Sequence, residues 1–121
     1  MPIDHTAVHV SDLERSKAFY SAALEPLGYS LIFEVGEFLG FGDGQMPNFG
    51  VVRRDPVGNG HVAFSAGDRG TVDAFHEAAI AAGGEDNGAP GLREHYHPSY
   101  YAAYVKDFDG NNIEAVCHMP E

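Results

Sequence analysis

The chain of 121 residues contains one supersecondary unit twice. When residues 5–28 are set against residues 61–84, at an offset of 56, eight of 24 positions are identical. The matching pairs are His5 and His61, Ala7 and Ala63, Asp12 and Asp68, Ala18 and Ala74, Phe19 and Phe75, Ala22 and Ala78, Ala23 and Ala79, and Gly28 and Gly84. Two copies are too few for a solenoid, which needs three or more stacked units. The repeat therefore indicates two duplicated modules, with a functional site between them.

The first half of the chain predicts a strand, a helix and three further strands. Residues 3–10 alternate as a strand, which places His5 and His9 on one face. Ser11 followed by Glu14 is a capping-box pattern, so a helix is expected to begin there. The remaining boundaries follow from turn residues: the helix ends near Leu24, and strands are expected near 29–35, 37–42 and 48–53.

The second half predicts the same order. A strand is expected at 61–66, and Asp68 is the expected N-cap of an amphipathic helix. The apolar stripe of that helix comprises Val72, Phe75, His76, Ala79 and Ile80. A loop rich in turn residues follows, and then strands at about 100–106 and 111–118. The fold class is therefore α+β: two tandem βαβββ modules, about 1–55 and 56–121, in one domain, with a curved mixed sheet around a central cleft and helices outside.

Charge and composition exclude several classes of protein. The net charge is −11 with only seven Lys and Arg, which argues against a nucleic-acid partner. A site that attracts an anion would need positive charge nearby, which Arg53, Arg54 or Arg93 could provide. No apolar run approaches a membrane span, and the first residues do not resemble a signal peptide, so we expect a cytoplasmic protein without a membrane partner.

Three residues could form a metal site: His5, His61 and Glu114. The two histidines are equivalent in the repeat, so packing of the modules about a pseudo-twofold axis could bring them together. Glu114 lies on the last strand, opposite the apolar face of Ile113 and Ala115. A carboxylate on the concave side of a sheet is costly unless it is paired or binds a cation. Two imidazoles and one carboxylate with open positions suit a divalent metal.

Several motifs in order carry a resemblance to a known family: Ile3-Asp4-His5, Val10 to Ser16, Ala18-Phe19-Tyr20, His61 to Phe64 and Asp109 to Glu114. Together they resemble the vicinal oxygen chelate superfamily, which includes glyoxalase I, bleomycin-resistance proteins, fosfomycin-resistance enzymes and extradiol dioxygenases. The resemblance covers essentially the whole chain. It implies the metal ligands His5, His61 and Glu114, and one divalent ion per site, which could be Fe, Mn, Ni or Zn.

The resemblance also bears on activity and assembly. Glyoxalase I has a further glutamate ligand on the last strand of its first module, and residues 48–53 contain no acid, so glyoxalase I activity is not expected. The bleomycin-binding branch lacks the metal triad. Members of this length commonly form homodimers, sometimes with sites shared between subunits. Whether His5 meets His61 of its own chain or of a second copy stays open.

His97, Tyr104 and Glu114 nearly match the spacing of the extradiol dioxygenase signature. The match implies that His97 acts as acid or base and that Tyr104 donates a hydrogen bond to a substrate oxygen. A five-residue loop at 107–111 would place Tyr104 directly opposite Glu114 on one face, whereas a two-residue turn would separate them. We expect the longer loop. The expected pocket residues are His9, Phe33, Phe49, Arg93 and Tyr100.

The leading functional hypothesis is a metal-dependent enzyme that acts on a small oxygen-bearing substrate, as a lyase or isomerase, a transferase or a dioxygenase. The alternative is a protein of the bleomycin-resistance type that sequesters a drug or metabolite without turnover. A third possibility is a subunit with a vestigial site that retains dimerisation.

Overall fold

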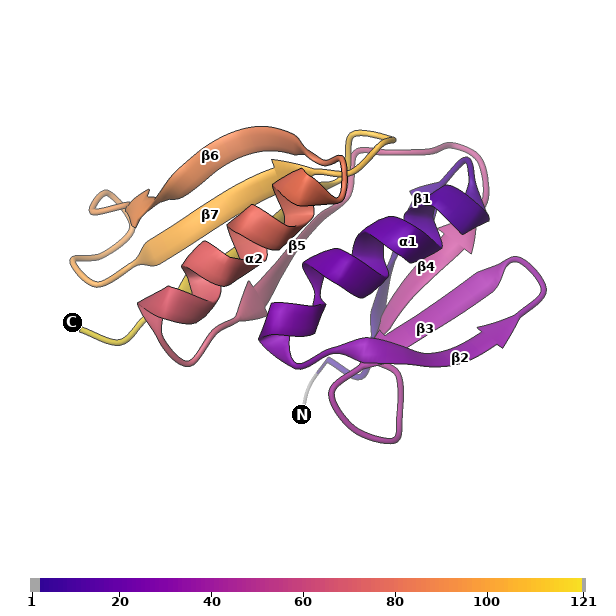
Figure 1. Cartoon of the computed structure of the whole chain (residues 1–121), viewed down its shortest axis with the longest axis horizontal. Coiled ribbons are helices and arrows are strands. Elements are labelled where there is room, and N and C mark those ends of the chain that lie inside the picture. Colours follow the sequence, from indigo (N-terminus) through magenta and orange to yellow (C-terminus); the bar gives the residue numbers. More distant parts are fainter. Residues whose placement is uncertain (1–2, 121) are drawn as a thin grey trace.

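The structure is a computed structural model that describes residues 3–120, and it contains two helices and eight strands (Figure 1). Neither of the helices within this range is long and apolar enough to cross a membrane. The first half contains β1 (Thr6–Val10), α1 (Leu13–Ala23), the short 3-10 helix η1 (Glu25–Leu27), β2 (Ser30–Val35), β3 (Phe38–Gly42) and β4 (Phe49–Arg53). The second half contains β5 (His61–Ser65), α2 (Arg69–Ala81), β6 (Glu85–Leu92), β7 (Tyr101–Lys106) and β8 (Asn112–Cys117).

Both modules have the predicted βαβββ order, and each forms its own four-stranded mixed sheet. The strand orders are β1-β4-β3-β2 and β5-β8-β7-β6. In each sheet the first strand pairs in parallel with the last, and the other pairs are antiparallel. The two orders correspond strand by strand, which confirms the duplication. The mixed sheet consists of two halves, one in each module, because β1 and β5 pair with strands of their own modules.

The helices lie side by side over one face of the sheets, and the core fills the space between these layers (Figure 1). Strand alternation sends Val8, Val51 and Ile113 into this core, where they are fully or almost fully buried. Aromatic edge-to-face contacts join the modules, as between Phe49 and Phe64 at 5.1 Å. The opposite face of each sheet has no helix over it, and we call it the free face.

One predicted cap is correct and the other is wrong. Asp68 caps α2 as expected, since its carboxylate accepts a hydrogen bond from the Thr71 N–H at 2.7 Å. The capping box at Ser11 does not form. Asp12 caps α1 instead, and the Ser11 hydroxyl donates to Asp109 at 2.7 Å. An aspartate cap is as good as a serine cap, so Ser11 is free to bind the second module.

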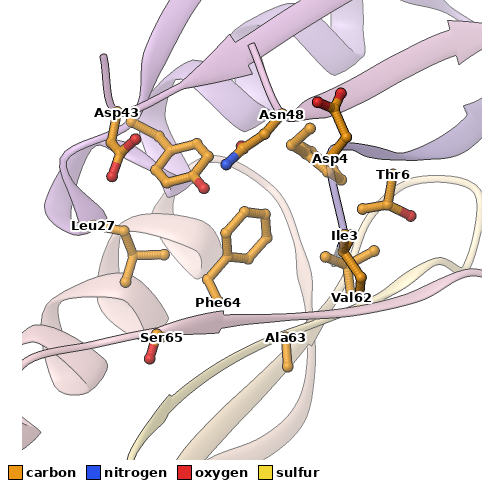
Figure 2. A pocket seen from close by; sticks show the side chains of 12 residues that line it. Ile3, Asp4, Thr6, Leu27, Asp43, Asn48, Val62, Ala63, Phe64 and Ser65 are labelled. Carbon is orange, nitrogen blue, oxygen red and sulfur yellow. The ribbon is translucent and has the colours of Figure 1, made fainter. Parts of the chain in front are cut away.

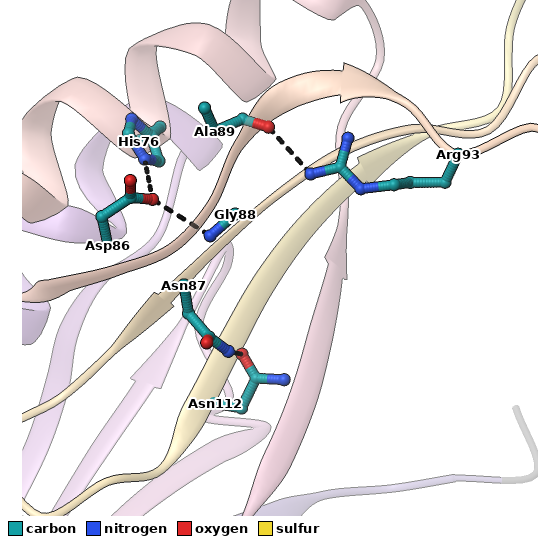
Figure 3. A network of polar contacts seen from close by, with 7 residues as sticks. All are labelled: His76, Asp86, Asn87, Gly88, Ala89, Arg93 and Asn112. Carbon is teal, nitrogen blue, oxygen red and sulfur yellow. Dashed lines mark hydrogen bonds and ion pairs between the residues drawn. The ribbon is translucent and has the colours of Figure 1, made fainter.

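A strand was missed at β6, where the sequence predicts a loop. This strand contains Pro90 and two glycines, and its pairing with β7 shifts register on both sides of Gly88. Proline is tolerated because β6 is the edge strand of its sheet. Side chains hold it in place: His76 Nε2 lies 3.0 Å from Asp86, which also accepts from the Gly88 N–H, and Asn87 donates to Asn112 (Figure 3).

The loop between β7 and β8 fastens the two modules together. Asp107, 6% exposed, accepts hydrogen bonds from the Tyr20 hydroxyl at 2.6 Å and from the Asn111 side-chain amide at 2.9 Å. Asn111, fully buried, also donates to the His9 carbonyl and accepts from the Gly60 N–H. These bonds connect α1, β1, the linker and the β7–β8 hairpin. We call Asp107, Asn111 and Tyr20 the junction network.

Candidate functional site

Glu114 is the centre of a polar cluster on the free face of module two. Its carboxylate is only 2% exposed, although its strand neighbours Ile113 and Ala115 face the core on the other side. His61 Nε2 lies 2.9 Å from Glu114 Oε1, and the Tyr100 hydroxyl donates to Glu114 Oε2. A buried carboxylate requires such partners, because an unpaired charge in the interior is costly. The structure thus brings together His61 and Glu114, two of the three predicted metal ligands.

The hairpin register places Tyr104 beside this pair. Lys106 pairs with Asn112 and Tyr104 pairs with Glu114, which confirms the five-residue loop. The Tyr104 and His61 rings lie 6.5 Å apart. Tyr104 therefore shares the free face with Glu114, as the dioxygenase-like spacing required.

Both tyrosines remain protonated at neutral pH. Burial, followed by the hydrogen bond to Glu114, raises the pKa of the Tyr100 phenol. Burial, followed by the negative charge of Glu114, raises the pKa of the Tyr104 phenol. Each phenol is consequently a hydrogen-bond donor: Tyr100 donates to Glu114, and Tyr104 is the phenol that could donate to an oxygen-rich ligand.

His97 lies next to Tyr100, with ring centroids 5.5 Å apart. The Ser99 N–H donates to His97 Nδ1 at 3.0 Å, so the hydrogen of a neutral His97 is on Nε2. That nitrogen lies 2.8 Å from His118 Nδ1, which accepts the hydrogen. His97 and His118 thus form a hydrogen-bonded pair at the edge of the cluster, with His97 as the donor.

His118 is the residue of this cluster that sequence reasoning missed. Its side chain is exposed, and its ring lies 5.2 Å from the Tyr100 ring. The signal was available, because His118 directly follows β8 and continues the alternation of Glu114 and Val116. The proximity of the chain end obscured it.

His5 and His9 are not part of the cluster. The His5 side chain is 71% exposed and bonds to Asp4 at 2.7 Å. It lies in a hollow lined only by module one, which includes Phe38 and Met46. His9 Nδ1 lies 3.1 Å from the Pro56 carbonyl and thereby holds the linker. Among residues 3–120, no group of three His, Cys, Asp or Glu side chains converges to hold a metal.

The other predicted pocket residues lie in three places. Phe33 is 49% exposed on the free face of module one, 6.0 Å from the Phe38 ring. Phe49 is buried in the core, 1% exposed, and packs on Tyr20 and Phe64. Arg93 lies over the Tyr104 ring, with its guanidinium carbon 5.3 Å from the ring centroid. Of the predicted pocket residues, only Tyr100 and Arg93 adjoin the Glu114 cluster.

A separate hollow of about 270 Å³ opens where the modules meet (Figure 2). Module one contributes Leu27, Asp43 and Asn48, and β5 contributes Phe64 and Ser65. The hollow contains no histidine and neither phenol of the cluster. The hollow is thus separate from the Glu114 cluster, which lies on the free face of module two.

Removing the Tyr100 hydroxyl tests how the cluster holds its carboxylate. We expect Tyr100→Phe to lower the free energy of unfolding by about 1–3 kcal/mol, because a buried acceptor loses its partner. Tyr96→Phe, at a tyrosine that is 60% exposed, should change it by less than about 0.5 kcal/mol. Urea unfolding of both variants gives the comparison, and equal effects would contradict the assigned role.

The difference in unfolding free energy between the wild type and Tyr100→Phe depends on pH with a definite sign. Because the pKa of Tyr100 is raised on folding, its stabilisation is fully present below about pH 10, the ordinary value of a phenol. The stabilisation is lost as the pH rises through the raised pKa. The stability difference between the wild type and Tyr100→Phe should thus be constant at neutral pH and shrink in strong alkali.

Comparisons with known proteins agree with this geometry. The family profile described as the Glyoxalase/Bleomycin resistance protein/Dioxygenase superfamily matches residues 2–115. A glyoxalase/bleomycin resistance protein from Albidiferax ferrireducens is 33% identical, with 97% of this chain and 99% of that chain covered and a TM-score of 0.86. A comparison with curated proteins found no match.

Two more distant structures share the fold. Lactoylglutathione lyase from Agrobacterium tumefaciens is 23% identical, with 95% of this chain and 92% of that chain covered and a TM-score of 0.69. The genomically encoded fosfomycin resistance protein FosX from Listeria monocytogenes is 20% identical, with 95% and 91% covered and a TM-score of 0.71.

Proposed function

Because the chain belongs to the glyoxalase/bleomycin resistance protein/dioxygenase superfamily, we propose that it is a divalent-metal-dependent enzyme acting on a small oxygen-bearing substrate. One observation carries the proposal: a buried carboxylate, Glu114, bound to His61 on a sheet face without a helix. Imidazole nitrogen and carboxylate oxygen are ligands that Fe, Mn, Ni and Zn accept. One hydrogen now bridges the two donor atoms, and a metal would take its place.

The third ligand in this proposal is His5 of a second copy of the chain. Within one chain His5 lies in a hollow of module one, apart from the His61–Glu114 pair. The free face of module one is also apolar, with Phe33 49% and Met46 79% exposed. Exposed apolar patches favour association. A twofold dimer that covers this face with module two of its partner would create two equal sites.

The chain's own residues supply the remaining functions. When bound, the metal provides a Lewis acid for neighbouring substrate oxygens, and Fe(II) would also permit oxygen activation. Tyr104 donates its phenolic proton to a substrate oxygen, and Tyr100 keeps Glu114 in position. His97 exchanges a proton with the substrate or with His118, which is hydrogen-bonded to it.

Metal content after mixing two inactive variants tests the shared site. His5→Ala and Glu114→Gln should each purify without stoichiometric metal. After the two are unfolded and refolded together, half of the dimers are mixed, and each mixed dimer has one intact site. We therefore expect metal to return to about a quarter of the wild-type level. Elemental analysis of untagged protein prepared without chelator provides the measurement.

Each alternative outcome has a clear meaning. A site built within one chain would gain no metal on mixing, because every site of the mixed dimer would carry one substitution. No metal in the wild type, even after reconstitution, would contradict the enzyme proposal.

The apolar residues Ile32, Phe33 and Met46 line one hollow on module one, and Phe33 and Met46 are exposed. They favour a second candidate function: sequestration of an apolar drug or metabolite without turnover. Binding of such a molecule with equal affinity by the wild type and by His5→Ala, together with absence of metal, would favour it.

A further inference from the structure

Positive charge is scarce in this chain, and most of it is engaged far from the Glu114 cluster. The net charge is −11, with seven Lys and Arg. Lys17 bonds to Glu34 and Arg53 to Glu37. Two other arginines lie over aromatic rings at other places, Arg15 over Phe108 and Arg69 over Tyr101. A small anion is thus repelled by the protein as a whole and needs a local cation.

Arg93 is the cation beside the cluster. Its guanidinium lies over the Tyr104 ring, and within residues 3–120 no carboxylate lies within ion-pair distance of it. One of its donors, Nη2, binds the Ala89 carbonyl at 2.8 Å (Figure 3). A guanidinium has five N–H donors in a planar fork that matches a carboxylate, so most of this fork is available to a ligand.

The backbone of β6 is shaped around this guanidinium. A side chain at Gly88 would come within 3.1 Å of Arg93 Nη2 and 2.8 Å of the Tyr104 ring. Gly88 also has φ +154°, which disfavours other residues. A side chain at Gly91 would come within 3.2 Å of Arg93 Nη1. The glycines at the register shifts of β6 thus leave space for an arginine above Tyr104.

We propose that Arg93 binds the acid group of the substrate, which is a small organic oxyanion with a flat apolar body. The Tyr104 ring adjoins both Arg93, at 5.3 Å, and the His61 ring, at 6.5 Å. A molecule whose acid group binds Arg93 would therefore lie along Tyr104, with a second oxygen directed toward the His61–Glu114 pair. The Tyr96 and Tyr100 rings, 4.7 Å apart, offer the flat apolar contact. The inference rests on the proposed function only for the position of that second oxygen.

Binding of two nearly isosteric probes to the full chain tests the inference. Salicylate carries an acid group next to a hydroxyl, and salicylamide replaces the acid by a neutral amide. Arg93→Gln should weaken salicylate binding at least about tenfold and change salicylamide binding less than about twofold. Arg54→Gln removes the same charge from an exposed position near Asp55 and should leave the preference for salicylate unchanged. Titrations followed by NMR, with and without Zn²⁺, provide the affinities.

The outcomes separate this inference from the proposed function. Loss of the preference for salicylate in Arg93→Gln supports it, whether or not the chain holds metal. Equal binding of the two probes by the wild type, no binding of salicylate, or the same loss in Arg54→Gln would overturn it. Phenylphosphonate serves as a further probe: the tighter-binding acid identifies carboxylate or phosphonate as the group that Arg93 recognises. Metal binding without an Arg93 effect leaves the proposed function intact and rejects this inference.

Discussion

Glu114→Gln is expected to lower metal affinity by about 100-fold or more, without unfolding the chain. The substitution removes the only carboxylate of the predicted ligand set. Even substitutions of residues that only hydrogen-bond to metal ligands lower metal affinity by about 10–100-fold. Glutamine has nearly the same shape. Its amide oxygen can accept from the Tyr100 hydroxyl, and its NH₂ can donate to His61 Nε2 once that ring changes tautomer.

The matched control is Glu77→Gln, which removes the same charge from an exposed position on α2. Metal titration should give wild-type affinity for Glu77→Gln and a large loss for Glu114→Gln, with similar circular dichroism for both. Full metal occupancy in Glu114→Gln would show that Glu114 is not a ligand. A loss of structure in that variant would show instead that the carboxylate is required for folding, and His61→Ala would then test the site.

Asp107→Ala is expected to destabilise the protein by about 3–5 kcal/mol, which is a large part of the stability of a single domain. The carboxylate of Asp107 accepts from the Tyr20 hydroxyl, the Asn111 side chain and the backbone N–H groups of Asp109 and Asn111. Alanine would leave these donors without a partner. Because several are buried, water cannot replace the lost acceptor.

Urea unfolding provides the measurement, with Asp43→Ala as the control. Asp43 is exposed, and its substitution should change stability by less than about 0.5 kcal/mol. Asp107→Asn keeps one acceptor oxygen and should fall between the wild type and alanine. A loss below about 1 kcal/mol for Asp107→Ala would mean that the junction network does not hold the modules together.

Local rules predicted the hairpin that forms the Glu114 cluster. The length of the loop at 107–111 determines which residues face each other, and alternation then determines the face of Tyr104 and Glu114. The loop length and the strand alternation are both properties of one short segment of the sequence. The register observed in β7 and β8 is the predicted one.

Features that depend on distant partners were not predictable. The Pro90 and glycine pattern of β6 is that of a loop, and only the neighbouring strand β7 makes it an edge strand. Ser11 has the pattern of a helix cap, but Asp109, 98 residues away, accepts its hydrogen bond. In the proposed dimer, the place of His5 in the site depends on what a second copy contributes, and a single sequence contains no signal for this.

The junction network has a consequence for how mutational data on this protein should be interpreted. Asp107 and Asn111 belong to the same turn that sets Tyr104 opposite Glu114. A one-residue slip of that turn would send every side chain of the hairpin to the other face. Variants at these two positions will therefore score as loss-of-function in a genetic selection, alongside variants of the proposed metal ligands, although both residues act through the turn that they hold. Protein abundance measured in parallel would distinguish variants that lose the folded structure from variants that lose only activity.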